Sequence, residues 1–158
     1  MIYSVKKGEH WFKPRQYRLF WKRKRLKVRF KFNKNCLYKS SYGQWNKLVG
    51  LSDFNTHHSK HSVRIGWRGS NFINIALALY TRINSEWSAK EMGFIEVEQW
   101  YEADIEIRRK EYVITFQGKE YSVGRKLRRK WGFNYFLQPD FRGKNTAYHD
   151  MDLELTWE

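Results

Sequence analysis

Apolar and polar residues alternate along much of the chain, which is the pattern of β-strands with one buried face. The clearest case covers residues 26–32, where the odd-numbered positions carry Lys27, Arg29 and Lys31 and every even-numbered position is apolar. Because successive side chains of a strand point to opposite faces, the segment predicts a strand with an apolar inner face and a cationic outer row. This row is a candidate electrostatic face for an anionic ligand.

The same period of two recurs further along, while helical periods scarcely appear. The other segments with this pattern are 17–22, 62–67, 73–80, 103–108, 112–116, 120–123 and 150–157. Their spacing predicts an all-β fold, one antiparallel β-sandwich of the concanavalin or laminin-G-like jelly-roll class. A length of 158 residues fits a single domain over 1–158, with a strongly basic N-terminal hairpin at 15–34.

Positive charge is concentrated near the N-terminus. The first 34 residues hold thirteen Lys and Arg beside one acid, Glu9, and the whole chain has a formal net charge of +15. We expect an anionic partner for a protein this basic, and a nucleotide or nucleic acid is favoured because phosphates bind Lys and Arg well. Composition leaves open whether the chain forms a homo-oligomer.

Three features indicate the compartment. The first residues carry no apolar stretch of the secretory type, and the longest apolar run, 75–80, is far too short to cross a bilayer. The single cysteine, Cys36, excludes an internal disulfide and fits a reducing environment. We therefore expect a cytoplasmic protein with no membrane partner.

The histidines allow three interpretations. His57, His58 and His61 lie within five positions, but Asp53 is the only carboxylate close by and cations flank the group, so no metal site is predicted. In the second interpretation these three and His149 supply acid–base chemistry on a phosphodiester, although no recognised two-histidine spacing is present. In the third, the segment is a polar loop that holds a ligand or faces water. No cofactor is expected in any of them.

Two more clusters are candidates for ligand contacts. On a strand, Arg64 and Arg68 share one face and leave a cationic notch for phosphate or carboxylate, while Trp67 points to the other face. The segment 138–150 holds a donor-rich turn, and its candidate residues are Lys144, Asn145, Tyr148 and His149. The alternative interpretation of both is structural, with surface arginines on a half-buried strand and an ordinary loop.

Motifs in these stretches resemble a group of small uncharacterised proteins from Bacteroidetes genomes and their phages. The matching positions are Asn46, Lys47, Leu48, Gly50, Ser52, His57, His58, Ser62, Arg64, Gly66, Trp67, Arg68, Phe141, Gly143, Asn145, Ala147, His149 and Asp150. The resemblance covers roughly residues 40–158 and departs at Tyr148, where proline is expected, and at Arg142, where glycine is expected. It implies a concanavalin-like sandwich and attaches no activity. By analogy it suggests a phage-encoded bacterial cytoplasmic protein that sequesters an immune signal.

Together these observations favour a non-enzymatic protein that binds or sequesters a phosphate-bearing ligand, either a nucleotide second messenger, cyclic or not, or a short nucleic acid. The arginines of 64–68 and the turn at 142–145 would hold phosphates, and Trp67 or Tyr148 would stack on a base. Two alternatives stay open. One is a metal-independent phosphodiesterase or nuclease. The other is a glycan-binding module whose tryptophans stack on sugars and whose charge selects an acidic glycan.

Overall fold

The computed structural model describes residues 1–40, 44–141 and 146–158, and within them it confirms an all-β fold. These residues form strands joined by short loops, with one 3-10 turn. The elements are β1 (Ile2–Val5), β2 (Leu19–Trp21), β3 (Arg25–Phe32), η1 (Lys34–Cys36), β4 (Asn46–Ser52), β5 (Ser62–Ser70), β6 (Asn74–Ile83), β7 (Glu86–Ile95), β8 (Tyr101–Ile107), β9 (Glu111–Phe116), β10 (Lys119–Gly124), β11 (Phe133–Leu137) and β12 (Met151–Trp157).

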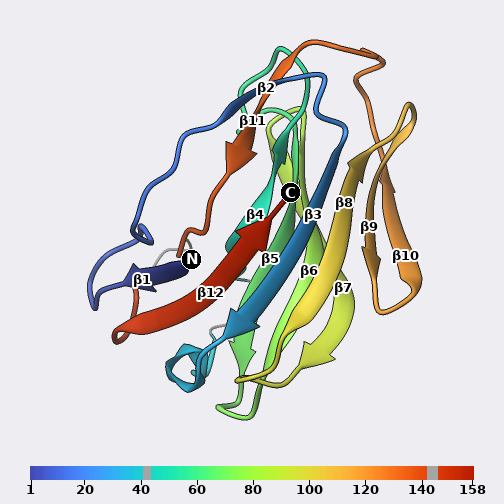
Figure 1. Cartoon of the computed structure of the whole chain (residues 1–158). Coiled ribbons are helices and arrows are strands. Elements are labelled where there is room, and N and C mark those ends of the chain that lie inside the picture. The colour runs from blue at the N-terminus through green and yellow to red at the C-terminus, as the bar shows by residue number, and fades with distance from the viewer. Residues whose placement is uncertain (41–43, 142–145) are drawn as a thin grey trace.

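The strands form two antiparallel sheets that pack face to face as a jelly-roll sandwich (Figure 1). Sheet A has the order β1-β12-β3-β8-β9-β10, and sheet B has the order β2-β11-β4-β5-β6-β7. Sheet A lies in front in Figure 1, with sheet B behind it. Each sheet buries one face against the other, so each leaves one outer face on which a ligand could lie.

The inner faces follow the alternation of the sequence. In β3 the apolar positions Leu26 and Phe30 are fully buried, as the pattern of residues 26–32 predicts. In β5 the same holds for Val63, Ile65 and Trp67. The indole of Trp67 packs among rings from four other segments, which are Phe12, Phe32, Tyr38 and Phe141. The core therefore joins the N-terminal segment to both sheets.

One expected feature is wrong. Residues 15–34 do not form a hairpin, because β2 pairs with β11 in sheet B while β3 pairs with β8 and β12 in sheet A. The chain between Trp21 and Arg25 therefore crosses from one sheet to the other. The reason is the core: Phe20 turns inward from β2 onto Trp157, at 5.8 Å between ring centroids, while the apolar face of β3 meets the inner face of sheet B.

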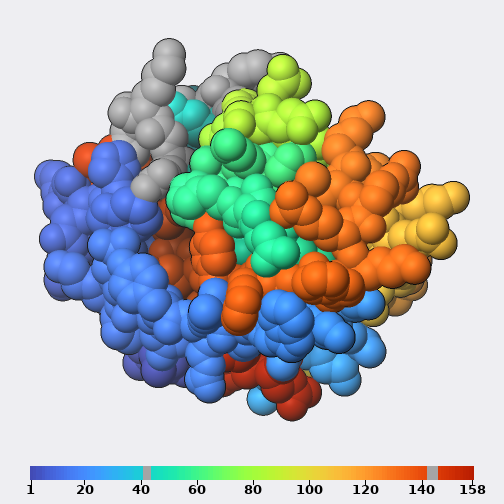
Figure 2. Space-filling view, turned by 90° about the horizontal axis from the view of Figure 1, so that it is seen from above, coloured from blue at the N-terminus to red at the C-terminus, as the bar shows by residue number. Residues whose placement is uncertain are grey.

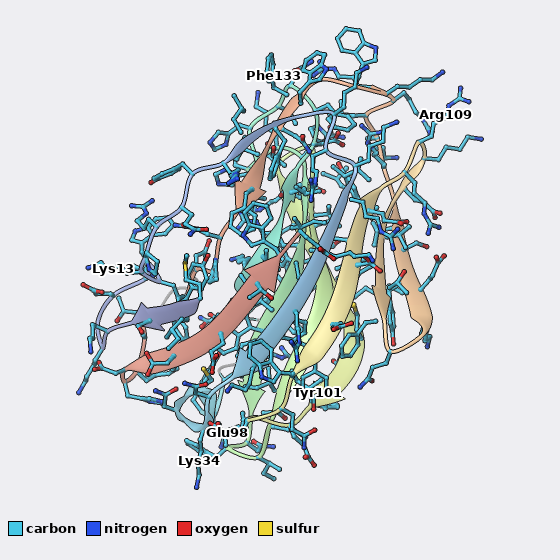
Figure 3. The ribbon with its side chains drawn as sticks, in the orientation of Figure 1. Lys13, Lys34, Glu98, Tyr101, Arg109 and Phe133 are labelled. Carbon is cyan, nitrogen blue, oxygen red and sulfur yellow. The ribbon has the colours of Figure 1, made fainter. Side chains whose placement is uncertain are left out.

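Loops that are far apart in the sequence meet at one end of the sandwich, which we call the upper end. It is made of the loops 22–24, 53–61, 84–85, 108–110 and 125–132. Figure 2 looks down on this end and shows the N-terminal segment in blue, the loop after β4 in green and the loop before β11 in orange. In Figure 3, Phe133 and Arg109 mark the upper end, and Lys34 and Glu98 mark the opposite one.

Candidate functional site

The predicted cationic row forms on the outer face of sheet A, but most of its charge is offset by acids. The β3 register places Lys27 opposite Asp104 and Arg29 opposite Glu102, and Lys31 lies opposite Glu154 on the other side. Ion pairs join Lys31 to Glu154 at 2.5 Å and Arg29 to Glu102 at 3.9 Å. Asp104 pairs with Arg25 at 3.0 Å, and Lys27 forms no ion pair within the described residues. Because acids from β8 and β12 offset most of the charge of this face, the expectation of an unopposed electrostatic face at Lys27, Arg29 and Lys31 is wrong.

A broad hollow of about 740 Å³ lies over this face, and its lining is electrically mixed. Lys27 and Arg29 contribute positive charge, while Glu102, Asp104 and Glu158 contribute negative charge. Such a lining gives no preference for an anionic ligand.

The outer face of sheet B has a different composition. On β5, Arg64, Gly66 and Arg68 point outward, as the sequence predicts. Their partners on β6 are Tyr80, Ala78 and Ala76 respectively. Small residues therefore line the middle of this face, and larger polar and aromatic side chains stand on both sides of them.

Aromatic rings and cations are paired across the outer face of sheet B. The rings of Tyr80 and Trp87 stack almost in parallel, at 6° and 6.0 Å between centroids. The guanidinium of Arg68 lies 4.2 Å from the centre of the Trp45 ring, and the ammonium of Lys47 lies 4.9 Å from that of Tyr80. Contacts of this kind hold a cation above a flat apolar surface.

A small hollow of about 70 Å³ opens beside these rings. Arg64 and Asp140 lie at its base, joined by a 3.1 Å ion pair in which both side chains are more than nine-tenths buried. The remaining lining residues are Lys47, His58, Ser59, Tyr80 and Arg82. The lining thus holds three cations, Lys47, Arg64 and Arg82, and one acid, Asp140, so the site favours a negative group.

His58 and Tyr135 form a polar pair next to this hollow. The Tyr135 hydroxyl accepts a hydrogen bond from the backbone N–H of His58 at 2.7 Å and lies 2.9 Å from Nδ1 of the same residue. Burial raises the pKa of Tyr135, and burial also raises the pKa of Tyr80 against the opposing effect of Arg82 and Arg64. Both phenols are therefore protonated near neutral pH and can donate hydrogen bonds.

The other candidate ligand contacts are dispersed. Trp67 has no exposed surface, so it cannot stack on a ligand that approaches from outside. Tyr148 contacts the rings of Tyr38 and Phe141, and His149 Nε2 lies 2.6 Å from the carbonyl oxygen of Asn35. The expected contacts Lys144 and Asn145 lie outside the described residues.

The four histidines proposed for catalysis do not converge on one point. The rings of His57 and His58 are 4.2 Å apart, and His57 Nδ1 also contacts the Ser59 hydroxyl at 2.7 Å. His61 is buried, and burial lowers its pKa. His149 belongs to the contact with Asn35 and does not line the hollow.

Sequence reasoning missed part of this face. Tyr80, Arg82, Trp87 and Asp140 were not among the predicted site residues, although all of them lie in or beside the hollow. A signal was present for Tyr80, because it follows Ala76 and Ala78 at every second position of β6. Nothing local indicates Asp140, which meets Arg64 from 76 positions away.

Within the described ranges, no group of three or more His, Cys, Asp and Glu residues is arranged to hold a metal ion. The same part of the chain contains no helix long and apolar enough to span a membrane.

Comparisons with known proteins identify the fold. No protein-family model matches the chain, and no curated protein matches it. Among solved structures, alginate lyase AlyC3 is similar over 99% of this chain and 74% of its own, with a TM-score of 0.64 and 11% identity. A Bacteroides ovatus GH16 protein bound to its mixed-linkage glucan product covers 99% of this chain and 78% of its own, at a TM-score of 0.58 and 8% identity. A toad ovary galectin in complex with thio-digalactose is similar over 91% of this chain and 99% of its own, at a TM-score of 0.51 and 10% identity.

At these identities the likeness shows the fold, a concanavalin-like jelly-roll sandwich. It also corrects the expected ligand and partner. The ligands named for the similar structures are carbohydrates, including dimannuronate with AlyC3, and none is a nucleotide or nucleic acid. The hypothesis of a nucleotide-binding sponge is therefore wrong, and the glycan-binding alternative agrees better with the comparisons. The geometry adds a physical reason, since Trp67 is buried and most of the charge of the Lys27 row is offset by acids.

Proposed function

We propose that this protein binds an acidic glycan on the outer face of sheet B. The observation that carries the proposal is the set of paired rings and cations there, with Arg68 over Trp45 and Lys47 over Tyr80. Sugar rings present flat apolar faces that stack on aromatic side chains, and carboxylates accept forked hydrogen bonds from guanidinium groups. A face that offers both suits a polymer of acidic sugars.

The charge of the site supports an acidic ligand over a neutral one. Lys47, Arg64 and Arg82 line the hollow, where Asp140 is the one acid among the lining residues. Arg68 adds a fourth cation, 3.9 Å from Glu91. The excess of positive charge would attract a carboxylate-bearing chain, and the similar structure with dimannuronate, an acidic sugar, gives this ligand class further support.

Trp87 is the most open of the rings at this site. Its side chain is about half exposed and lies flat against Tyr80, so one face of the indole remains available for a sugar ring. A chain that stacks on Trp87 passes directly beside Lys47 and Arg82. We therefore assign Trp87 the stacking role and the neighbouring cations the recognition of carboxylates.

The test is calorimetric titration with oligosaccharides of alginate or polygalacturonate, each compared with the same material after its carboxyl groups have been reduced to alcohols. We expect binding of the acidic form and at least tenfold weaker binding of the reduced form. Replacing Arg68 or Trp87 by Ala should weaken binding of the acidic form at least tenfold. If the acidic and reduced sugars bind equally, or neither binds, the proposal is wrong.

A matched control comes from the opposite sheet. Arg29 and Trp100 form a cation–ring pair on the outer face of sheet A, at 4.7 Å, much like Arg68 with Trp45. Arg29→Ala and Trp100→Ala should leave glycan affinity unchanged. Equal losses from both sheets would indicate that net charge alone binds the polymer.

A second candidate function, cleavage of the same glycan, rests on the pair of His58 and Tyr135. In a β-elimination a base removes the proton next to the uronate carboxylate, the neighbouring C–O bond breaks, a carbon–carbon double bond forms and the leaving oxygen takes up a proton. His58 could accept the first proton, and the protonated phenol of Tyr135 could supply the second. Arg64 and Lys47 would stabilise the charge that develops on the carboxylate.

Incubation with the acidic polymer distinguishes binding from cleavage. Cleavage would produce shorter chains with an unsaturated end that absorbs ultraviolet light, and His58→Gln would abolish this product while retaining affinity. Recovery of the polymer at its original length would leave the protein as a binding module alone.

A further inference from the structure

Three exposed aromatic rings form a cluster at the upper end of the sandwich. Trp21, Trp131 and Phe133 are between 52% and 57% exposed, and Trp21 lies 4.8 Å from Phe133 and 5.8 Å from Trp131 between ring centroids. Leu19, on the same strand as Trp21, is 67% exposed and extends the apolar surface. Contiguous exposed apolar surface of this kind is typical of an interaction site for a protein, a membrane or a ligand.

The cluster is held on a fixed backbone. The backbone N–H of Asn55 donates to the carbonyl of Phe133 at 2.7 Å, and the N–H of Phe133 donates to the Asn55 side chain at 2.8 Å. Gly132 has a φ of +147°, and a Cβ there would meet the Asn55 side chain at 2.6 Å. The N–H of Lys22 also donates to the carbonyl of Gly132, at 3.0 Å. Two of the rings are therefore held on the paired strands β2 and β11, and Trp131 lies on the loop that these hydrogen bonds fasten.

The surroundings of the cluster are almost purely cationic. The five loops of the upper end contain twelve Lys and Arg and one acid, Asp53, which is buried and paired with Arg125. Nine of these cations are exposed and form no ion pair within the described part of the chain: Lys22, Lys24, Lys60, Arg109, Lys110, Lys126, Arg128, Arg129 and Lys130. In Figure 3 Arg109 extends away from the sandwich at this end.

Two hollows beside the cluster have the same charge. One, of about 510 Å³, is lined by ten residues of which seven are Lys or Arg, and Glu106 is its one acid. The other, of about 610 Å³, is lined by Trp21, by the basic run 22–25 and by Lys27 and Glu158. The exposed rings thus lie between two hollows that are lined mostly by Lys and Arg.

We propose that the upper end docks on the surface of a negatively charged lipid bilayer. Trp and Phe side chains partition into the region between headgroups and acyl chains, and exposed Lys and Arg add attraction to anionic lipids. Trp21, Trp131 and Phe133 would enter this region while the surrounding cations face the headgroups. Trp21 meets Phe133 edge to face and Trp131 at a tilt, so the rings offer no flat platform for a sugar chain. Phe133 lies two residues from Tyr135 on β11, so the cluster adjoins the glycan site but shares none of the residues that line its hollow.

The experiment is co-sedimentation with vesicles of phosphatidylcholine alone and with vesicles in which phosphatidylglycerol replaces part of it. We expect binding to the mixed vesicles only, with loss at high salt. The variant Trp21→Ser, Trp131→Ser, Phe133→Ser should bind at least tenfold more weakly. Its control is Trp87→Ser, Trp100→Ser, Phe94→Ser, which removes two tryptophans and one phenylalanine of similar exposure elsewhere and should bind vesicles like wild type.

A second pair of variants tests the charge. Lys22→Gln, Lys126→Gln, Lys130→Gln should weaken binding roughly 100-fold, because each cation near an anionic bilayer contributes about a factor of five. Lys34→Gln, Lys39→Gln, Lys119→Gln removes the same charge from other exposed positions and should have little effect. Absence of binding to mixed vesicles, or equal losses in the test and control variants, would overturn the proposal. A shift of the native indole emission on binding, lost in the ring variant, would support it.

Discussion

Arg125 and Asp53 form a forked ion pair that is closed off from solvent. Nε of Arg125 donates to one carboxylate oxygen of Asp53 at 2.7 Å and Nη2 donates to the other at 2.6 Å. The hydroxyl of Tyr112 donates to the same carboxylate at 2.5 Å, and Arg125 reaches the carbonyl of Arg129 at 2.8 Å. The pair therefore fastens the loop 125–132, which carries part of the aromatic cluster, to both sheets.

Removing one member of this pair should destabilise the protein strongly. Arg125→Met leaves a buried carboxylate with one remaining side-chain donor, and a broken buried pair typically costs about 3–5 kcal/mol of unfolding free energy. Denaturant titration followed by tryptophan fluorescence measures the change. Lys126→Met, next in the chain but exposed, should alter stability by less than about 0.5 kcal/mol. Equal effects of the two substitutions would show that the pair is not a structural anchor.

Gly50 should tolerate no side chain, because β4 and β5 approach closely at this position. A Cβ on Gly50 would lie 2.1 Å from the carbonyl oxygen of Val63 and 2.7 Å from the Cα of Arg64. Gly50→Ala should therefore cost at least about 1–3 kcal/mol and weaken glycan binding by displacing Arg64. At Gly124 a Cβ would meet nothing within 4 Å, so Gly124→Ala is the matched control. Thermal melts of both variants measure the difference in stability, and equal melting temperatures would contradict the prediction.

His61 should make stability depend on pH in a defined direction. Burial lowers its pKa in the folded protein, with Arg129, Arg125 and Lys60 acting in the same direction and Asp53 opposing them. As pH falls below about 6.5, the unfolded chain takes up a proton that the folded protein does not, so the free energy of unfolding decreases until the lower folded pKa is reached. His61→Gln should remove this part of the slope, at most about 1.4 kcal/mol per pH unit. Parallel curves for wild type and variant would contradict the assignment.

Local alternation was enough to predict the fold class and several side-chain directions. In β5 it placed Arg64 and Arg68 on the outer face and Trp67 in the core, and the structure confirms this placement. Such a prediction succeeds because the side-chain period of a strand is two whichever strand lies next to it.

Pairing between distant strands could not be predicted in the same way. The opposition of Lys31 to Glu154 and of Arg64 to Asp140 depends on sheet order and register, which no short segment contains. The contact of Trp21 with Trp131 likewise depends on β2 joining sheet B while β3 joins sheet A. The net charge of a surface depends on these pairings. The basic composition of residues 1–34 therefore predicted a positive face where acids from β8 and β12 lie beside the cations.

The outer row of β3 provides a test of that correction. If the ligand binds on sheet B, then Lys27→Gln, Arg29→Gln, Lys31→Gln should change affinity for acidic glycans less than about twofold at 0.1 M salt, because the row lies on the outer face of the other sheet and exposed charges are screened within about 10 Å. The reverse variant, Glu102→Gln, Asp104→Asn, Glu154→Gln, should expose the row and add a weak, salt-sensitive binding mode. Titration at two salt concentrations separates this mode from the site on sheet B, since exposed charges are screened within about 10 Å at 0.1 M salt. A large loss of glycan affinity in the variant that lacks the three cations would indicate that the ligand binds on sheet A.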